Sequence, residues 1–328
     1  MKKLRAALVG LGIMGSNHAR VLSSLADVDL VAIADPQGDV RGLVPNQEVL
    51  KTVDDVIRKG VDYCVIAAPT ALHEEISVKL LDAGVHVLIE KPLSHNSQSA
   101  RRIAEIAQRR GLVGAVGHVE RFNSAFQQAR VRILNDELGE IYQISTRRLG
   151  PFPSRIADVG VVMDLATHDI DLSAWITGAK YRSVSAQSSK RVGRTYEDLV
   201  AITAKLDNGV VVNHLVNWIS PLKERKTVIT GAKGSFVIDT LTSDLTFYAN
   251  GTFTIQQDQL AHLRGVSQGD IHIYAFDKPE PLRTQHSNFR DVLFGKGGEV
   301  VSLENACRTV EVAEAILRSC QTEKVVAL

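Results

Sequence analysis

The first 120 residues alternate short apolar runs with longer segments in which apolar residues recur at helical spacing. Apolar runs of strand length occupy residues 5–12, 28–35, 61–69, 85–90 and 113–119. Segments of helical pattern occupy residues 14–25, 53–60, 71–84 and 94–111. Strands that are apolar on both faces and separated by helices indicate a parallel sheet covered on both sides. The pattern predicts a doubly wound α/β domain over residues 1–120.

The pattern changes after residue 120. Two helical patterns and one strand follow, at residues 121–138, 161–178 and 139–150. Longer strands come next, and the turn sequences DNG at 207–209 and GAKG at 231–234 indicate hairpins between them. An amphipathic helix at 303–320 closes the chain. We therefore expect residues 121–328 to form an α+β domain with a mostly antiparallel sheet.

Composition narrows the class of protein. Of 328 residues, 45% are hydrophobic and 23% charged, as in ordinary globular proteins. The net charge is +1, so nothing favours nucleic acid or an anionic membrane surface as a partner. No apolar run approaches about 18 residues, which predicts a cytoplasmic protein. Cys64, Cys307 and Cys320 lack C-x-x-C spacing, so reduced thiols are expected rather than a disulfide framework or a zinc site.

Residues 9–15, VGLGIMG, fit the pattern G-x-G-x-x-G between an expected strand and an expected helix. Gly10 permits a tight turn, Gly12 lets the backbone approach a pyrophosphate, and Gly15 lets helix and strand pack closely. Ile13 and Met14 complete the loop, where the helix N-terminus offers N–H groups to phosphates. The loop predicts a Rossmann domain that binds a dinucleotide.

Asp35 ends the second expected strand. An acid at this place accepts hydrogen bonds from the adenosine ribose hydroxyls and repels a 2′-phosphate. No Lys or Arg follows Asp35 until Arg41. We therefore expect NAD as the cofactor rather than NADP.

Another expected strand ends on Glu90, Lys91 and Pro92, within the sequence LIEKPLSH at 88–95. A solvated Glu-Lys pair at a strand exit is the plain interpretation, and such a pair contributes little. Proline biases Lys91 towards an extended backbone and permits a cis bond. The sequence thus constrains the backbone of Lys91 without indicating which group the side chain faces.

The segment MDLATHDIDLSAW, residues 163–175, brings several polar groups to one helical face. At about 100° per residue, a set of four residues falls within roughly 60°: Asp164, His168, Asp171 and Trp175. An apolar stripe suited to the core lies apart from them and contains Leu165, Leu172 and Ile176. A solvated polar face or a structural histidine is the alternative to catalysis. Asp164 and His168 lack a third ligand nearby, so no metal is expected.

Five elements in this order resemble the glucose–fructose oxidoreductase/inositol dehydrogenase/MocA superfamily over nearly the whole chain. They are GLGIMG at 10–15, AAPTALHEE at 67–75, E-K-P at 90–92, GHVERFN at 117–123 and D-x-x-x-H at 164–168. Three segments look more narrowly like the UDP-N-acetylglucosamine 3-dehydrogenase branch: residues 117–123, 147–171 and 217–239. The resemblance implies an N-terminal Rossmann domain and a C-terminal domain with a large, mostly antiparallel sheet. It also implies a homodimer or homotetramer built on that sheet.

The resemblance further implies that Lys91 and His168 meet at the nicotinamide. Lys91 would contact the reacting sugar oxygen and His168 would be the acid/base. Asp164 and Thr167 would help to place the substrate. An ammonium beside the oxygen stabilises developing negative charge, and a neutral imidazole can take the proton.

The remaining residues carried over from the resemblance line the ligands. Pro69, Thr70 and His73 would lie along the cofactor, with Glu90 near the nicotinamide ribose or amide. Two arginines, Arg148 and Arg155, are candidates for a substrate phosphate or carboxylate, with surface solvation as the alternative for each.

The leading hypothesis is an NAD-dependent dehydrogenase that oxidises a ring hydroxyl of a sugar, with C3 of a UDP-N-acetylhexosamine-type nucleotide sugar as the first choice. The alternative substrate is inositol or another free polyol, oxidised at position 2. A non-catalytic NAD-binding sensor is the alternative from another class, since folds host many functions. A sensor would be expected to lack Lys91 or His168, and both are present.

Overall fold

The computed structural model describes residues 3–44, 47–153, 159–193, 195–251 and 268–328. Contacts between Cα atoms divide the chain into two compact units. Unit 1 contains Met1–Val119 and Glu280–Glu314, and unit 2 contains Glu120–Pro279 and Ala315–Leu328. Residues 280–314, which the sequence pattern assigns to the second domain, therefore group with unit 1.

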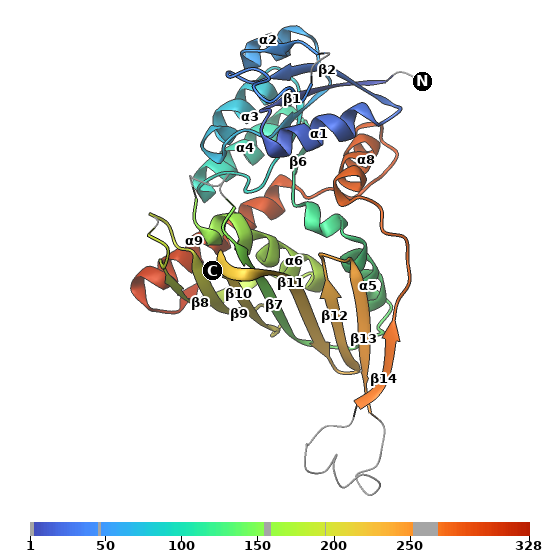
Figure 1. The fold of residues 1–328 in the computed structure, drawn as a ribbon, viewed down its shortest axis with the longest axis vertical. Helices are drawn as coiled ribbons and strands as arrows, with labels where there is room; N and C mark the ends of the chain where they lie inside the picture. Colours follow the sequence, from blue (N-terminus) through green and yellow to red (C-terminus); the bar gives the residue numbers. More distant parts are fainter. Residues whose placement is uncertain (1–2, 45–46, 154–158, 194, 252–267) are drawn as a thin grey trace, which may run out of the picture. The chain divides into compact units, whose positions relative to one another are not determined.

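Unit 1 is a doubly wound parallel sheet (Figure 1). Its strands, in spatial order, are β3 (Val49–Leu50), β2 (Val28–Ala34), β1 (Leu4–Val9), β4 (Tyr63–Ile66), β5 (His86–Ile89) and β6 (Gly114–Val116). Its helices are α1 (Ile13–Ser23), α2 (Val53–Arg58), η1 (Thr70–Leu72), α3 (His73–Asp82), α4 (Ser97–Arg110) and α8 (Pro281–Leu293), and α9 (Leu303–Thr322) begins in it. The order of strands reverses between β1 and β4, which is where such sheets bind their ligands.

Alternate residues of β1 enter two different apolar layers. Ala7 and Val9 belong to the layer that contains residues of α3, α4 and the start of α9. Ala6 and Leu8 belong to the opposite layer, with residues of α1 and α8. Both faces of the sheet are therefore covered, as the continuous apolar strands predict.

Helix α8 was not predicted from the sequence. Its Phe289 is buried in the second apolar layer of unit 1 and lies edge-on to Tyr63 of β4, with ring centroids 5.4 Å apart. The contact joins residues far apart in the chain, so no local pattern announces it. This packing places α8 in unit 1, and the start of α9 joins the same unit through the other apolar layer.

Unit 2 is built on a nine-stranded sheet within its described residues. The strands, in spatial order, are β14 (Gln268–Ile273), β13 (Asp244–Asn250), β12 (Gly234–Asp239), β11 (Ile219–Gly231), β7 (Ile141–Pro151), β10 (Val211–Asn217), β9 (Leu199–Leu206), β8 (Tyr181–Ser189) and β15 (Val326–Ala327). Among the described strand pairs, β10 and β7 run parallel and the others run antiparallel. The expected hairpins at 207–209 and 231–234 are confirmed, because they join β9 to β10 and β11 to β12.

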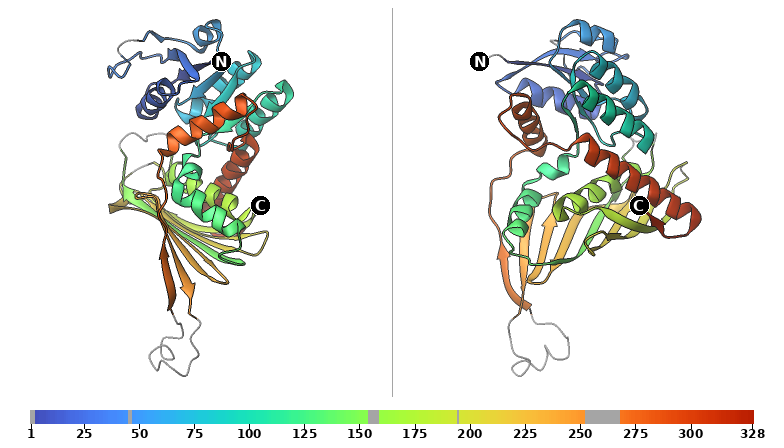
Figure 2. Two further views of the ribbon diagram at one scale, coloured as in Figure 1. Left: turned by 90° about the vertical axis from the view of Figure 1, so that its right-hand side faces the viewer. Right: turned by 180° about the vertical axis from the view of Figure 1, so that it is seen from behind.

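Helices α5 (Ser124–Leu134) and α6 (Thr167–Thr177) lie on one face of this sheet (Figure 2). Strand β7 shows the consequence, because Ile144, Thr146 and Arg148 are buried whereas Gln143 and Arg147 are exposed. The covered face therefore carries polar as well as apolar side chains. No helix in the described part of the chain has the length and apolarity needed to cross a bilayer.

Candidate active site

The glycine loop of unit 1 has the geometry that its sequence predicts. Gly10 has φ +94°, and a Cβ there would lie 2.6 Å from the carbonyl carbon of Ala67. A Cβ at Gly15 would lie 2.0 Å from the carbonyl oxygen of Gly10. At Gly12 a Cβ would meet no described atom within 4 Å, so this backbone borders open space. Two glycines therefore close the turn, and the third leaves room for a ligand to approach.

The N-terminus of α1 suits an anion. Gly12 is its N-cap and offers no side-chain hydrogen bond, and the first turn, with Ile13 and Met14, contains no acidic residue. The N–H groups of such a turn and the positive end of the helix dipole attract phosphate. The residues present therefore fit the pyrophosphate of a dinucleotide.

Asp35 lies directly after β2, beside the glycine loop. Its Oδ2 accepts a hydrogen bond from the backbone N–H of Leu11 at 2.8 Å, and its Oδ1 accepts one from Gln37 at 2.8 Å. An ionised carboxylate offers about four acceptor positions, so further lone pairs remain for ribose hydroxyls. Asp35 thus fixes the loop and can also bind the adenosine ribose.

His73 is buried at the start of α3 and faces main chain. Its Nδ1 lies 3.0 Å from the carbonyl oxygen of Pro92, and its Nε2 lies 2.9 Å from that of Ala68. Burial lowers the pKa of His73 below its ordinary value, although these carbonyls oppose the shift. Pro69 is exposed and Thr70 half-buried. Of the three residues expected along the cofactor, His73 is therefore the one engaged in holding the chain around Pro92.

Glu90 is 8% exposed, so the interpretation as a solvated Glu-Lys pair is wrong. Its Oε2 accepts a hydrogen bond from the N–H of Lys91 at 3.2 Å, and its Oε1 lies 2.9 Å from Nε2 of His18. Burial by itself raises the pKa of Glu90, but the hydrogen bond from His18, with Lys91 and His73 nearby, brings it below its ordinary value. Lys91 is half-buried, and its bond to Pro92 is cis.

In unit 2 the helix with Asp164 and His168 is not a regular α-helix. Val162–Ala166 form a π-helical turn, η3, and α6 begins at Thr167. The prediction that Asp164 shares one helical face with His168 assumed a regular step of about 100° per residue. The π turn between these two residues breaks that regularity, so the predicted face does not extend across it to Asp164. Such turns are frequent at functional sites. Asp164 and Thr167 are buried and His168 is half-buried.

The alternative of a solvated polar face is also wrong. Asp171 accepts two hydrogen bonds from the guanidinium of Arg121, at 2.7 and 2.6 Å, and both side chains are buried. Trp175 is buried as well, with the guanidinium of Arg130 4.4 Å from its ring centroid. Of the four residues expected on one face, Asp171 and Trp175 thus anchor the helix.

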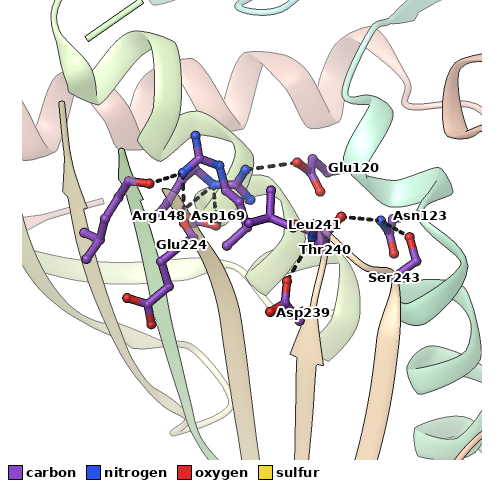
Figure 3. Close-up of polar contacts among 11 residues, drawn as sticks. Glu120, Asn123, Arg148, Asp169, Glu224, Asp239, Thr240, Leu241 and Ser243 are labelled. Carbon is purple, nitrogen blue, oxygen red and sulfur yellow. Dashed lines mark hydrogen bonds and ion pairs between the residues drawn. The ribbon is translucent and has the colours of Figure 1, made fainter. Parts of the chain in front are cut away.

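Arg148 is 4% exposed, so surface solvation is not its environment. Its Nε lies 3.0 and 3.1 Å from the two carboxylate oxygens of Asp169, and its Nη1 donates to Glu120 at 3.0 Å (Figure 3). Burial alone would lower the pKa of Arg148, but the two carboxylates raise it above its ordinary value. Its charge is met inside the protein. Arg155, the other arginine expected at the substrate, lies outside the described residues.

Arg225 is a residue that the sequence analysis missed. It lies on β11 directly opposite Arg148 of β7. Its Nη1 donates to the carbonyl oxygens of Leu149 at 2.6 Å and Glu224 at 2.8 Å, and no carboxylate of the described residues lies within ion-pair distance. Burial and then the charge of Arg148 lower its pKa, whereas Asp169, Glu120 and Asp164 oppose the shift. Only strand register could have revealed this pairing.

A doubly wound sheet with this loop and this acid defines a dinucleotide-binding protein of the Rossmann class. The profile of the GFO_IDH_MocA oxidoreductase family with an NAD-binding Rossmann fold matches residues 4–118. The profile of the GFO/IDH/MocA C-terminal domain matches residues 126–237. The chain belongs to this family, so the predictions of family, fold class, enzyme and NAD are confirmed.

Three relatives show the range of the family around this chain. A UDP-N-acetylglucosamine 3-dehydrogenase of Acidithiobacillus ferrooxidans is 29% identical over 258 residues, 78% of this chain and 80% of that protein. A solved structure of this enzyme has a TM-score of 0.85 at 24% identity and covers 98% of this chain and 99% of that one. The scyllo-inositol 2-dehydrogenase (NAD(+)) of Bacillus subtilis is 26% identical, with 73% of this chain and 75% of that protein covered.

The third is the WlbA dehydrogenase of Bordetella pertussis, solved in complex with NADH and UDP-GlcNAcA. It has a TM-score of 0.84 at 20% identity and covers 100% of this chain and 98% of that one. At this identity the likeness concerns the fold. The protein is an NAD-binding oxidoreductase, and the relatives at similar identity act on different substrates.

Proposed function

We propose that this protein oxidises a secondary hydroxyl of a sugar with NAD. We further propose that its substrate is a UDP-N-acetylhexosamine-type nucleotide sugar, oxidised at C3. Support for a sugar or polyol comes from the relatives, which include a UDP-N-acetylglucosamine 3-dehydrogenase at 29% identity. The observation that carries the choice of an anionic sugar is Arg225. A half-buried guanidinium bonded only to carbonyls, among the described residues, retains its charge for a ligand.

Oxidation of an alcohol removes a proton from oxygen and a hydride from carbon. We assign Lys91 to the reacting oxygen, where its ammonium would stabilise developing negative charge. His168 would take the proton, and Asp164 and Thr167 would orient the substrate. NAD supplies the hydride acceptor.

We assign the glycine loop, with Gly10, Gly12, Ile13, Met14 and Gly15, to the pyrophosphate. Asp35 would bind the adenosine ribose, and Glu90 the nicotinamide half of the cofactor. Pro69 and Thr70 would lie along the cofactor. His73 would act through the backbone of Pro92, because both of its ring nitrogens face carbonyl oxygens.

For the substrate's anionic group we propose Arg225 in place of Arg148. Arg148 already faces two carboxylates, and a phosphate brought to it would meet Asp169 and Glu120. Arg225 lies in the neighbouring position of the same sheet face and has no such partner in the described part of the chain. Its charge is within electrostatic reach of Asp164.

Turnover of UDP-sugars and of inositols, followed by the absorbance of NADH, tests the substrate. We expect UDP-N-acetylhexosamines to react and inositols to react far more slowly. Good inositol turnover with none of the UDP-sugars would overturn the substrate and keep the reaction class.

Lys91→Ala tests the assignment of roles. Loss of one charge-stabilising donor lowers kcat by about a hundredfold or more. His168→Gln should lower it in the same direction. An unchanged kcat for Lys91→Ala would remove this lysine from the mechanism.

We further propose a cytoplasmic homodimer or homotetramer. The uncovered face of the sheet in unit 2 carries a row of apolar side chains in register, Val228, Val237 and Ile273, with Thr246 between the last two. Ile273 is 79% exposed, which favours a second chain as its cover. Light scattering after size exclusion measures the mass directly, and a monomer at micromolar concentration would contradict this assembly.

A further inference from the structure

Unit 1 buries a chain of three titratable side chains next to the E-K-P turn, which is Glu90–Pro92 after β5. Nε2 of His18, in α1, lies 2.9 Å from Oε1 of Glu90, and Nδ1 of His18 lies 2.8 Å from Nε2 of His286, in α8. The two rings meet edge to face, with centroids 5.0 Å apart. His18 is 0% and His286 1% exposed. The three side chains come from three segments that are far apart in the sequence.

The arrangement fixes where the protons lie. An ionised carboxylate only accepts hydrogen bonds, so Nε2 of His18 must carry the proton that faces Glu90. In a neutral His18 the Nδ1 atom is then an acceptor, and Nε2 of His286 must donate to it. Nδ1 of His286 has no hydrogen-bond partner among the described residues. If this nitrogen carries no proton, it leaves only a lone pair unsatisfied, which costs less than a buried N–H without an acceptor.

Electrostatics supports the same assignment. Burial lowers the pKa of His286 well below its ordinary value, so His286 stays neutral. The charged or titratable groups that act on Glu90 are His18 of α1, Lys91 beside it and His73 of α3. A Cβ at Gly117 would lie 2.7 Å from Oε1 of Glu90, so the backbone after β6 closes the pocket around this oxygen.

We propose that His18 and His286 are positioning residues for the E-K-P turn: His286 orients His18, and His18 holds Glu90 ionised and in place. Glu90 in turn holds the N–H of Lys91 through its other oxygen. The inference rests on the proposed function only in giving Lys91 its part in the reaction. The proton positions and the ionised Glu90 do not depend on any substrate.

The direct test is the tautomer of each histidine, read from long-range ¹H–¹⁵N correlation spectra of the full-length protein at pH 7. We expect protons on Nε2 of both His18 and His286. A His18 with its proton on Nδ1 would present a lone pair to Glu90, which would then have to be protonated. That result would overturn the proposal, and no substrate or turnover is needed to obtain it.

The second test compares conservative and apolar variants. His18→Gln keeps an N–H that can reach Glu90, whereas His18→Leu leaves the carboxylate buried without it. We expect kcat of His18→Leu to fall by about tenfold to a hundredfold, the range for losing a hydrogen bond to a charged group, and His18→Gln to recover most of it. His286→Leu and His286→Gln should repeat this contrast with a smaller loss.

The pH profile separates positioning from simple packing. Without His18 the buried Glu90 carboxyl has a higher pKa, because burial then acts with less opposition. Glu90 would therefore protonate at higher pH, and the acid limb of kcat in His18→Leu should move to higher pH. A variant that loses thermal stability and keeps the wild-type pH profile would reduce the pair to a packing role and overturn the proposal.

His86→Asn is the matched control. His86 begins β5, the strand whose other end leads to Glu90, and its Nδ1 accepts from the N–H of Val113 at 2.9 Å. We expect its variant to keep the wild-type pH profile.

If Lys91→Ala retains full activity while the His18 spectra are as expected, the proposed roles fail and the proton assignment stands. Binding of NADH, followed by fluorescence, gives a readout for His18→Leu even if no sugar reacts.

Discussion

Arg148 and Arg225 occupy facing positions on neighbouring strands, β7 and β11, yet their surroundings differ in kind. Arg148 is fully enclosed and meets the carboxylates of Asp169 and Glu120. Arg225 is half-buried and donates to two carbonyl oxygens. The charge of Arg148 is therefore neutralised by carboxylates, whereas the charge of Arg225 is met only by the dipoles of carbonyl groups.

This difference separates an arginine that holds the fold from one that can recognise a ligand. A buried cation between two carboxylates is already at low energy, and a further anion there would be repelled by both. A cation that has only carbonyl dipoles gains a charge-assisted bond when an anion arrives. Residue type and position in a motif do not distinguish the two, since both are arginines in segments that resemble the family and only Arg148 stands out as a candidate in the sequence.

Arg148→Met should have the largest effect on stability. It leaves Asp169 and Glu120 facing each other without their cation, and breaking a buried pair in this way costs about 3 to 5 kcal/mol. Urea denaturation of the full chain would measure the loss in the free energy of unfolding. Arg148→Lys, which retains the charge, should lose less and covers the case in which the methionine variant does not fold.

Arg147→Met is the control for this prediction. Arg147 immediately precedes Arg148 in β7, lies on the uncovered face and pairs with Glu224 at 3.0 Å, with 54% of its side chain exposed. Exposed pairs contribute at most about 1 kcal/mol. Equal losses for Arg147→Met and Arg148→Met would mean that the buried cluster has no special part in stability.

Arg225→Gln should act on the substrate rather than on the fold. We expect KM for a UDP-sugar to rise by about tenfold to a hundredfold, since a hydrogen bond to a charged group contributes about 1.5 to 3 kcal/mol. KM for NAD should stay within about twofold, because the glycine loop and Asp35 bind the cofactor, and the effect should fade for an uncharged sugar.

Lys226→Gln provides the comparison for Arg225→Gln. Lys226 is adjacent in the chain, is exposed and pairs in register with Arg147 on the other face of the sheet. Its variant should leave KM for the UDP-sugar unchanged. If Arg225→Gln matches it, the anionic group of the substrate binds elsewhere, and the comparison between the two arginines loses its functional meaning.

Local features were predictable where neighbours in the chain decide them. The glycine loop, Asp35 and the two hairpins depend on backbone conformation within a few residues, as with Gly10 at φ +94°. Features that depend on register or on distant segments were not. Arg225 opposite Arg148, and His286 against His18, join residues whose proximity only the folded chain creates. The π turn at Val162–Ala166 likewise has no periodicity of its own to reveal it.

His214 is a neutral side chain on the same covered sheet face as Arg148 and Arg225, and it extends the comparison to an uncharged group. It lies on β10, opposite Thr146 of β7, and its ring nitrogens lie 2.7 Å from Oγ1 of Thr146 and 2.9 Å from the hydroxyl of Tyr181. Burial lowers the pKa of His214 to about 4, with the positive charge of Arg148 acting in the same direction and Asp169 against it.

The lowered pKa of His214 sets a pH window for stability. In the unfolded chain a histidine titrates near pH 6.5, so between about pH 6.5 and pH 4 the unfolded state binds the extra proton. Stability from His214 is therefore present above this window and is lost as the pH falls through it. On going from pH 7 to pH 5, wild type should lose about 2 kcal/mol more than His214→Gln, measured by urea denaturation at each pH. Equal losses would show that the pKa of His214 is the same in the folded and the unfolded chain. The surroundings of Arg148 would then tolerate a second positive charge.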